Sequence, residues 1–169
     1  AKLIVTSEIS FSGSVNGKQN VGGLVGKVED EAKITLSENY TVSGSISSEN
    51  GNAGGLIGSV VNNPVTVAGG KKVSVQENAA LSANGTSGAA GGLFGSSIIS
   101  QNMTLDLSAY TVSGVTMTSG QYAGGLFGVL KNGSEGATEN HAITITSGTD
   151  ENKVDVSSSA SGVGNYGGL

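Results

Sequence analysis

The sequence has no cysteine, no arginine and no tryptophan, and only one proline in 169 residues. Without cysteine, the chain can form neither disulfides nor thiolate metal sites. The net charge of −5 argues against nucleic-acid binding, which needs a positively charged footprint. Aromatic residues make up 4% of the chain, and charged residues make up 12%. This composition favours a thin, layered core of small side chains over a rounded one.

Long apolar runs are also missing. No stretch approaches the length of a membrane-spanning helix, so we expect no membrane insertion within this segment. The N-terminus lacks the basic start and apolar run of a secretion signal. Because the chain begins in a strand-like run, Leu3-Ile4-Val5, and ends inside a repeated motif, we expect residues 1–169 to be a single domain cut from a longer surface protein.

Glycine, by contrast, is abundant, with 29 residues. Many of these lie in a phrase that reads Gly-Gly-Leu-x-Gly after a small apolar residue. It occurs in full at 21–26, 53–58, 90–95 and 123–128, and a fifth copy begins at Tyr166. The copies lie about 30 to 40 residues apart, a period typical of repeat proteins. The repeat is defined by Gly22, Gly23, Leu24, Gly54, Gly55, Leu56, Gly91, Gly92, Leu93, Gly124, Gly125 and Leu126.

Two further elements precede each glycine phrase. One is an alternating segment with a threonine between apolar residues, such as Ile34-Thr35-Leu36, which has the period of a half-buried strand. The other is a short apolar-polar segment, such as Val42-Ser43-Gly44-Ser45-Ile46. Each repeat therefore has three expected strands, and the extra length of some repeats falls at corners, where a solenoid tolerates insertions.

These patterns predict an all-β fold, a right-handed parallel β-helix (β-solenoid) of about five three-stranded rungs with no substantial helix. Stacking would place the repeat leucines, including Leu169, in one column. The glycine pair would form a tight corner, through positive φ or through close backbone approach. The residue after each leucine is apolar, and we expect a bend that brings both side chains into the core. The alternative is an outward apolar column that would be a docking surface.

The glycine phrases resemble the GLUG motif family, named for Gly-Leu-any-Gly. The resemblance is carried by Gly23-Leu24-Val25-Gly26 and its three counterparts, and it covers most of the chain because the motif recurs. Such repeats are found in large secreted or surface-attached bacterial proteins, including adhesin-like proteins and the non-catalytic parts of immunoglobulin A-cleaving metallopeptidases. The resemblance implies an extracellular structural or adhesive module, and it supplies no catalytic residues.

Residues suited to chemistry are sparse. His141 is the single histidine, which is too few for a zinc motif. The glycine phrases lack the Lys-Ser/Thr ending and the following helix of a phosphate loop. The acidic clusters Glu29-Asp30-Glu31 and Asp150-Glu151 favour solvated corners, with calcium as the weaker alternative. We therefore predict no catalytic, cofactor-binding or metal-ligating residue and no enzymatic activity.

The most suggestive surface is an expected outward column of threonines. Its members are Thr6, Thr35, Thr66, Thr104 and Thr144. Flat threonine arrays on β-solenoids resemble the ice-binding faces of antifreeze proteins, which use two parallel columns in the pattern Thr-x-Thr. The second column here is irregular and partly charged. It reads Glu8, Ser37, Ala68, Asp106 and Thr146. Threonine suited simply to an exposed strand position is the favoured interpretation.

The sequence thus predicts a non-catalytic structural or adhesive module of a bacterial extracellular or cell-surface protein. Its partner, a host or cell-surface protein or a glycan, is not identified by any residue pattern. One alternative is an ice-binding solenoid that uses the threonine column. Another is a fibre element that associates end to end through uncapped rungs. A carbohydrate-active solenoid is disfavoured because the chain has no arginine.

Overall fold

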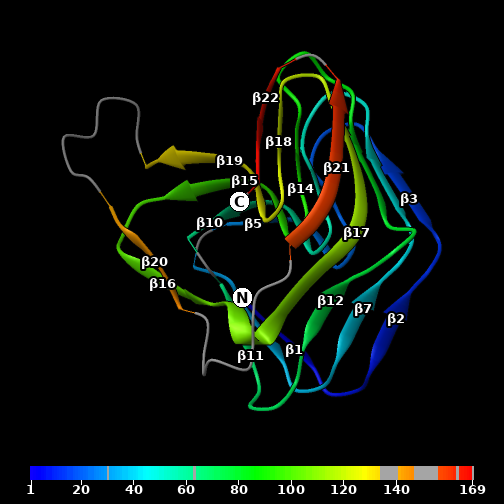
Figure 1. Ribbon diagram of the computed structural model, residues 1–169. Helices are drawn as coiled ribbons and strands as arrows, with labels where there is room; N and C mark the ends of the chain where they lie inside the picture. The colour runs from blue at the N-terminus through cyan, green and yellow to red at the C-terminus, as the bar shows by residue number, and fades with distance from the viewer. Residues whose placement is uncertain (30, 63, 134–140, 147–155, 163, 169) are drawn as a thin grey trace.

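The chain winds as a parallel β-solenoid of about four turns, which confirms the expected fold class (Figure 1). The computed structural model describes residues 1–29, 31–62, 64–133, 141–146, 156–162 and 164–168. Most strands pair in parallel with their counterpart in the next coil, because successive coils repeat the same pattern of apolar and polar residues. In Figure 1, four strands lie side by side in chain order, from blue to yellow-green: β2 (Ile9–Phe11), β7 (Tyr40–Val42), β12 (Val73–Val75) and β17 (Tyr110–Ser119).

The strands divide into four full coils and part of a fifth. Coil one contains β1 (Lys2–Val5), β2 (Ile9–Phe11), β3 (Ser14–Gly17), β4 (Val21–Gly22) and β5 (Val25–Val28). Coil two contains β6 (Lys33–Leu36), β7 (Tyr40–Val42), β8 (Ser45–Ser48), β9 (Ala53–Gly54) and β10 (Ile57–Val61). Coil three contains β11 (Val65–Val67), β12 (Val73–Val75), β13 (Ala80–Ala83), β14 (Ala89–Gly91) and β15 (Phe94–Ile99). Coil four contains β16 (Met103–Asp106), β17 (Tyr110–Ser119), β18 (Tyr122–Gly124) and β19 (Phe127–Asn132), and coil five contains β20 (Ile143–Thr146), β21 (Val156–Gly162) and β22 (Asn165–Gly167).

Each of the first three coils therefore has five short strands where three were expected. The extra strands arise from two bends that alternation alone does not reveal. The middle segment of coil one breaks between Phe11 and Ser14, and the glycine phrase breaks at Gly23 and Leu24. In coil four, β17 runs through the first of these positions without a break, with a register shift between Val112 and Val115.

Helical structure is confined to one short turn within the described residues. A 3₁₀ helix spans Leu107–Ala109, and the Asp106 side chain caps it by accepting a hydrogen bond of 2.9 Å from the Ser108 amide. The absence of a substantial helix in the described chain agrees with the composition, which is rich in poor helix formers.

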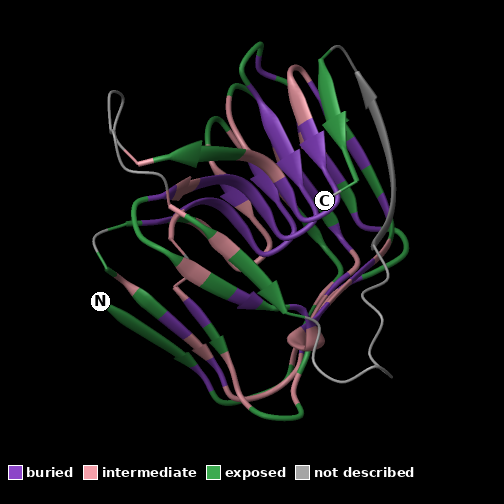
Figure 2. Ribbon diagram, turned by 60° about the vertical axis from the view of Figure 1, so that its left-hand side comes forward, coloured by how far each residue is buried: buried purple, intermediate pink, exposed green. Residues whose placement is uncertain are grey.

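The core is a set of apolar columns that run from coil to coil. Val42, Val75 and Val112 form one column, and Ile46, Leu81 and Met117 form another. All six side chains are buried. In Figure 2 the buried stretches, in purple, are concentrated on strands in the middle of the stack, and the strands near the two termini are largely exposed. Full burial of one such side chain contributes about 1.5–3 kcal/mol, so the columns account for much of the stacking energy.

The leucine column is confirmed for the four described leucines. The Leu24 amide donates to the Leu56 carbonyl at 3.0 Å, and the same contact recurs from Leu56 to Leu93 and from Leu93 to Leu126. Each acceptor takes a second bond, because the amide of the residue after the leucine donates to the same oxygen, as Ile57 does to Leu93 at 3.0 Å. The fifth expected member, Leu169, lies outside the described residues.

The expected bend after each glycine pair is also confirmed. Leu56 and Ile57 are both fully buried, as are Leu93 and Phe94, so the outward apolar column does not form in these coils. Two successive amides that point to one carbonyl break the strand alternation, and this lets neighbouring side chains enter the same core.

The glycines of the phrase are required by close backbone approach. Positive φ among the described glycines occurs at Gly70, Gly114 and Gly164, none of which belongs to a complete phrase. A Cβ at Gly55 would fall well inside 3.0 Å of the Gly92 carbonyl oxygen and 2.8 Å from a methyl group of Val75. The second glycines of the first three phrases, Gly23, Gly55 and Gly92, therefore face the core with no room for a side chain.

The first and last glycines of the phrase lie on the other side of the bend. A Cβ at Gly95 would lie 2.6 Å from the Gly58 carbonyl oxygen and 2.8 Å from the Ala53 carbonyl oxygen. At Gly54 it would meet the carbonyl oxygen of Ile57 and, at 2.7 Å, the amide of Gly95. The two limbs of the bend thus pack backbone against backbone, which explains why glycine recurs on both sides of the leucine.

Candidate functional site

The threonine column predicted from sequence is divided by the strand register. Thr35 lies beside Thr66 in the β1-β6-β11 sheet, and Thr104 lies beside Thr144 in the separate β16-β20 sheet. No ladder joins β11 to β16 among the described strands. In coil one, Ile4 takes the place expected for Thr6, which follows the end of β1.

The threonines do point outward as expected. Thr66, Thr104 and Thr144 are exposed, while the flanking Leu36, Val65 and Leu105 are buried. However, the Ile4 side chain is 51% exposed beside Thr35, and Asp106 lies beside Thr146 in the neighbouring column. The threonine surface is therefore two short pairs with apolar and charged neighbours.

A longer hydroxyl-bearing surface lies on the sheet formed by β3, β8, β13 and the second half of β17. Two outward columns run along it, two residues apart on each strand. The first column is Ser14, Ser45, Ala80 and Thr116. The second column is Asn16, Ser47, Ser82 and Thr118. We call these eight residues the hydroxyl face.

The backbone of β21 continues both columns in register. Ser159 lies beside Thr116, and Ser161 lies beside Thr118. The register shift in β17 falls before Val115, so it leaves the paired part of the columns intact. The described side chains of the hydroxyl face thus come from four coils. The backbone pairing of these strands continues into the fifth coil.

Buried residues alternate with the two columns and support them from inside. Ile46 lies between Ser45 and Ser47, and Met117 lies between Thr116 and Thr118, and both apolar side chains are buried. Ser45, Thr116 and Thr118 are exposed, and Ser47 is half-buried. This period-two alternation over a packed core holds the outward side chains on one surface.

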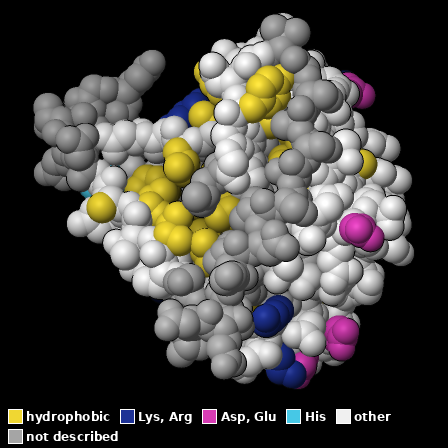
Figure 3. Space-filling model, in the orientation of Figure 1, with side chains coloured by type: hydrophobic (Ala, Val, Ile, Leu, Met, Phe, Trp, Pro, Cys, Tyr) yellow, Lys and Arg dark blue, Asp and Glu magenta, His cyan; other side chains and the backbone are white. Residues whose placement is uncertain are grey.

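Hydroxyl and amide groups supply the chemistry of this face, and none of its eight residues carries a charge. Only one side-chain hydrogen bond is found within the described part of the face, from the Ser82 hydroxyl to Asn84 at 2.7 Å. Lys18, Glu49 and Glu77 lie in the adjoining bends. In Figure 3 the surface over these strands is mostly neutral, with isolated acidic side chains.

The sequence contains a pattern that marks this face, although dividing each repeat into three segments does not reveal it. Ser45-Ile46-Ser47 and Thr116-Met117-Thr118 have a hydroxyl-x-hydroxyl pattern, which the threonine column carries only in part because its second column is irregular. Both triplets lie in the middle segment of the repeat, where the apolar residues predict only the buried face of the strand. The bend before β8 and the break in alternation at Gly44 conceal that the pattern belongs to an outward face.

The acidic corner at Glu29 holds charges of both signs. Glu29 forms an ion pair with Lys27, and a recess of 580 Å³ beside it is lined by Glu31, Lys33, Asn62 and others. Asp30 and the second acidic cluster, Asp150-Glu151, lie outside the described residues. Within the part that is described, no three acidic or histidine side chains come together as metal ligands.

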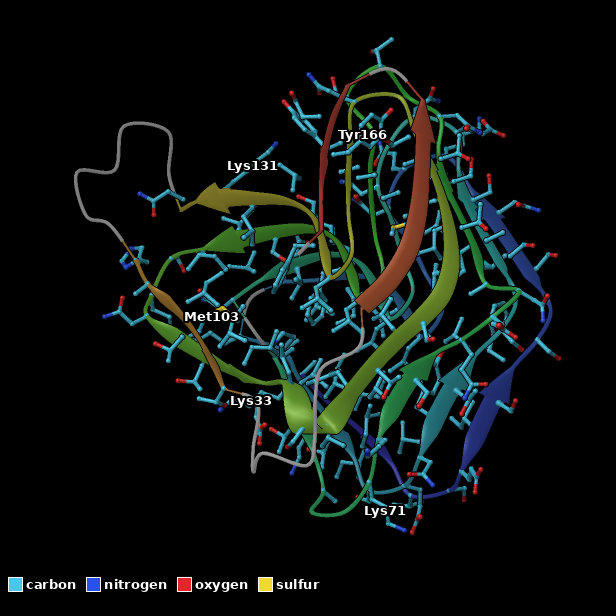
Figure 4. The ribbon with its side chains drawn as sticks, viewed as in Figure 1. Lys33, Lys71, Met103, Lys131 and Tyr166 are labelled. Atoms are coloured by element: carbon cyan, nitrogen blue, oxygen red, sulfur yellow. The ribbon has the colours of Figure 1, made fainter. Side chains whose placement is uncertain are left out.

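The remaining ionisable groups are dispersed. Figure 4 shows Lys33, Lys71 and Lys131 on separate elements, and Lys71 pairs with Glu38 at 2.5 Å. Hydrogen bonds from Ser108 lower the pKa of Asp106. Burial raises the pKa of Tyr40, and burial together with the Asp106 carboxylate raises the pKa of Tyr110.

His141 is half-buried beside β20, next to Ile143. Among the described helical residues, none forms a segment long and apolar enough to cross a membrane. Comparison with protein-family models, curated proteins and solved structures gives no significant match for this chain.

Proposed function

We propose that this chain is a non-catalytic structural and adhesive module of a bacterial extracellular or cell-surface protein. The observation that carries the proposal is a parallel ladder that runs unbroken from coil to coil in the β4-β9-β14-β18-β22 sheet. One column of it runs from Val21 through Ala53, Ala90 and Ala123 to Tyr166. A ladder of this kind makes a rod in which each added coil repeats the same outward faces.

The adhesive part of the proposal is supported by the outward surfaces. Equivalent positions recur at the coil spacing of roughly 4.8 Å, so weak contacts to an extended target can add together. The GLUG resemblance points the same way, since such repeats accompany surface-attached proteins.

Display of the chain on a non-adherent bacterium tests this function. We expect displaying cells to be retained under flow on cultured epithelial cells, glycan-coated glass, bare glass or an ice surface. Retention on at least one of these should exceed that of cells displaying a Gly55→Val variant by several-fold. Gly55→Val places a side chain against the Gly92 carbonyl and should disrupt the coils. Equal retention of both cell types on every surface, at equal display, would contradict the proposal.

A further inference from the structure

The hydroxyl face presents a two-dimensional array of hydrogen-bonding groups. Along each strand, its two columns are two residues apart, which corresponds to roughly 6.6 Å. Between coils, the members of each column are spaced by roughly 4.8 Å. Strict register holds these two repeats from β3 to the second half of β17.

The side chains of this array are small and neutral. Charged groups bind their own hydration water strongly, and desolvating them is costly, whereas hydroxyls both donate to and accept from neighbouring water. Thr116 and Thr118 are β-branched, so their rotamers are restricted and their hydroxyls hold their directions. Within the described part of the face, Ser82 alone forms a side-chain hydrogen bond with another protein group, so the remaining hydroxyls are available to an outside partner.

The array lacks the feature that would favour a sugar ligand. None of its eight residues is aromatic, so it offers no ring for a pyranose to stack on. It also lacks the charges that steer binding to a protein partner. A rigid lattice of water molecules suits it better, because the neutral donors and acceptors of the array are of the same kind as those of water and recur regularly in two directions.

We propose that the hydroxyl face binds ice, with Ser14, Ser45, Thr116, Asn16, Ser47, Ser82 and Thr118 as its hydrogen-bonding groups and Ala80 filling the remaining place. This inference deepens the proposed function and rests on it, since it names the surface to which the module adheres. It differs from an ice-binding threonine column, because that column is divided between two sheets and has Ile4 and Asp106 among its neighbours.

The test is partition of the fluorescently labelled full chain into slowly growing ice. We expect the wild-type chain to be enriched in the ice fraction several-fold over serum albumin. Thr118→Lys places a flexible charge within the array and should reduce enrichment to the albumin level. Thr66→Lys makes the same change at an exposed position on a different sheet, and it should leave enrichment unchanged.

Two further variants protect the test against unfolding. Thr118→Val retains the β-branched shape without the hydroxyl and should give enrichment between wild type and Thr118→Lys. Ser45→Lys introduces the same charge in the other column and should also reduce enrichment to the albumin level. Circular dichroism melting of each variant establishes that the coils are intact.

The outcomes separate the inference from the proposed function. Wild-type enrichment at the albumin level overturns ice binding, and so does a Thr66→Lys loss without a Thr118→Lys loss. If cells that display the chain still adhere to epithelial cells or glass, the adhesive function stands without ice as its target. Binding to cellulose or chitin that Thr118→Lys abolishes would instead assign the hydroxyl face to a glycan and overturn the inference.

Discussion

Three positions of the repeat require glycine because neighbouring atoms leave no room for a Cβ, either on the core side of the bend or on its outer side. The second glycine faces the core columns, and the first and last face each other across the outside of the bend. Since the phrase glycines are not among the residues with positive φ, the demand comes from neighbouring coils and not from the glycine's own dihedral angles. Glycine is therefore needed at these positions because an adjacent coil packs against them.

The substitution Gly55→Ala should lower the free energy of unfolding by about 2–3 kcal/mol, since the added methyl group meets the Gly92 carbonyl and the Val75 side chain. Urea denaturation followed by circular dichroism measures the change. Gly69→Ala is the matched control, because a Cβ there meets nothing within 4 Å. Equal stability of the two variants would show that the bend relaxes around the extra atom.

The sequence indicated that a corner needed glycine, but it left two physical causes open. Gly-Gly in isolation is equally compatible with a left-handed turn and with close packing. The choice depends on which atoms of coils two and three surround Gly55, and those atoms come from residues such as Gly92 and Val75 that are far away in the chain. Local sequence cannot supply that information, even when the repeat itself is evident.

At the scale of strands, register brings two buried tyrosines into one column. Tyr40 of β7 and Tyr110 of β17 lie on either side of Val73 of β12. The Tyr40 hydroxyl is buried and has no hydrogen-bond partner. A buried hydroxyl without a partner is a destabilising feature, so Tyr40→Phe should leave stability unchanged or slightly raised at neutral pH. Urea denaturation at pH 7 measures the difference.

The same column predicts a loss of stability at alkaline pH. Burial raises the pKa of Tyr40 and Tyr110 above the ordinary value of about 10. Between the unfolded and folded pKa values, the unfolded chain therefore loses protons that the folded chain retains. The free energy of unfolding should then fall as the pH rises above about 10, while remaining unaffected by these groups below it.

Urea midpoints measured from neutral pH to about pH 11 test this dependence. The Tyr40→Phe, Tyr110→Phe double variant should show a flatter decline than the wild-type chain. Tyr166→Phe, which removes an exposed hydroxyl, is the control and should follow the wild type. A double variant as sensitive to alkali as the wild type would place the responsible groups elsewhere.

Strand faces were easier to predict than strand ends. The alternation in Ile34-Thr35-Leu36 correctly placed threonine outside and its neighbours inside. It did not reveal that Phe11–Val15 contains a bend, because the residues on both sides of the bend are the same types that a single continuous strand would have. The assignment of Thr6 to the column used its similarity to other threonines, whereas pairing aligns Ile4 with Thr35.

For the molecule as a whole, the coils are nearly interchangeable. Deletion of residues 24–55 joins Gly23 to Leu56 and removes the length of one coil, so that β1–β4 and β10 together form one coil that stacks on coil three. We expect this shortened chain to retain its β-sheet circular dichroism spectrum and to melt cooperatively at a lower temperature, since one interface between coils is lost.

Deletion of residues 33–48 is the corresponding control, because it removes β6, β7 and β8 but leaves the rest of coil two. That chain should lose its cooperative melting transition. A shortened chain without 24–55 that also fails to melt cooperatively would mean that particular neighbours, and not the repeated geometry, hold the coils together.

The overall architecture was predictable because it is repeated in the sequence, and repetition makes a weak pattern strong. The hydroxyl face was not predicted, although it is also repeated. Ala80 and Asn16 carry no hydroxyl group and so interrupt the pattern of serine and threonine. Only the pairing of β3, β8, β13 and β17 shows that the two columns exist. Such a surface is a property of register and requires the coordinates of several coils together.

The direction of the ladders also determines how the rod responds to force. Its hydrogen bonds run from coil to coil, such as those that converge on the Leu56, Leu93 and Leu126 carbonyls. Tension applied to the two ends of the chain therefore peels one coil from the next, and does not shear all the bonds of a strand at once. A coil of about 32 residues extends to roughly 110 Å when pulled straight, against a folded rise of roughly 4.8 Å. A tether built from these coils would lengthen in steps under load and dissipate work at each step, which limits the peak force on whatever it connects.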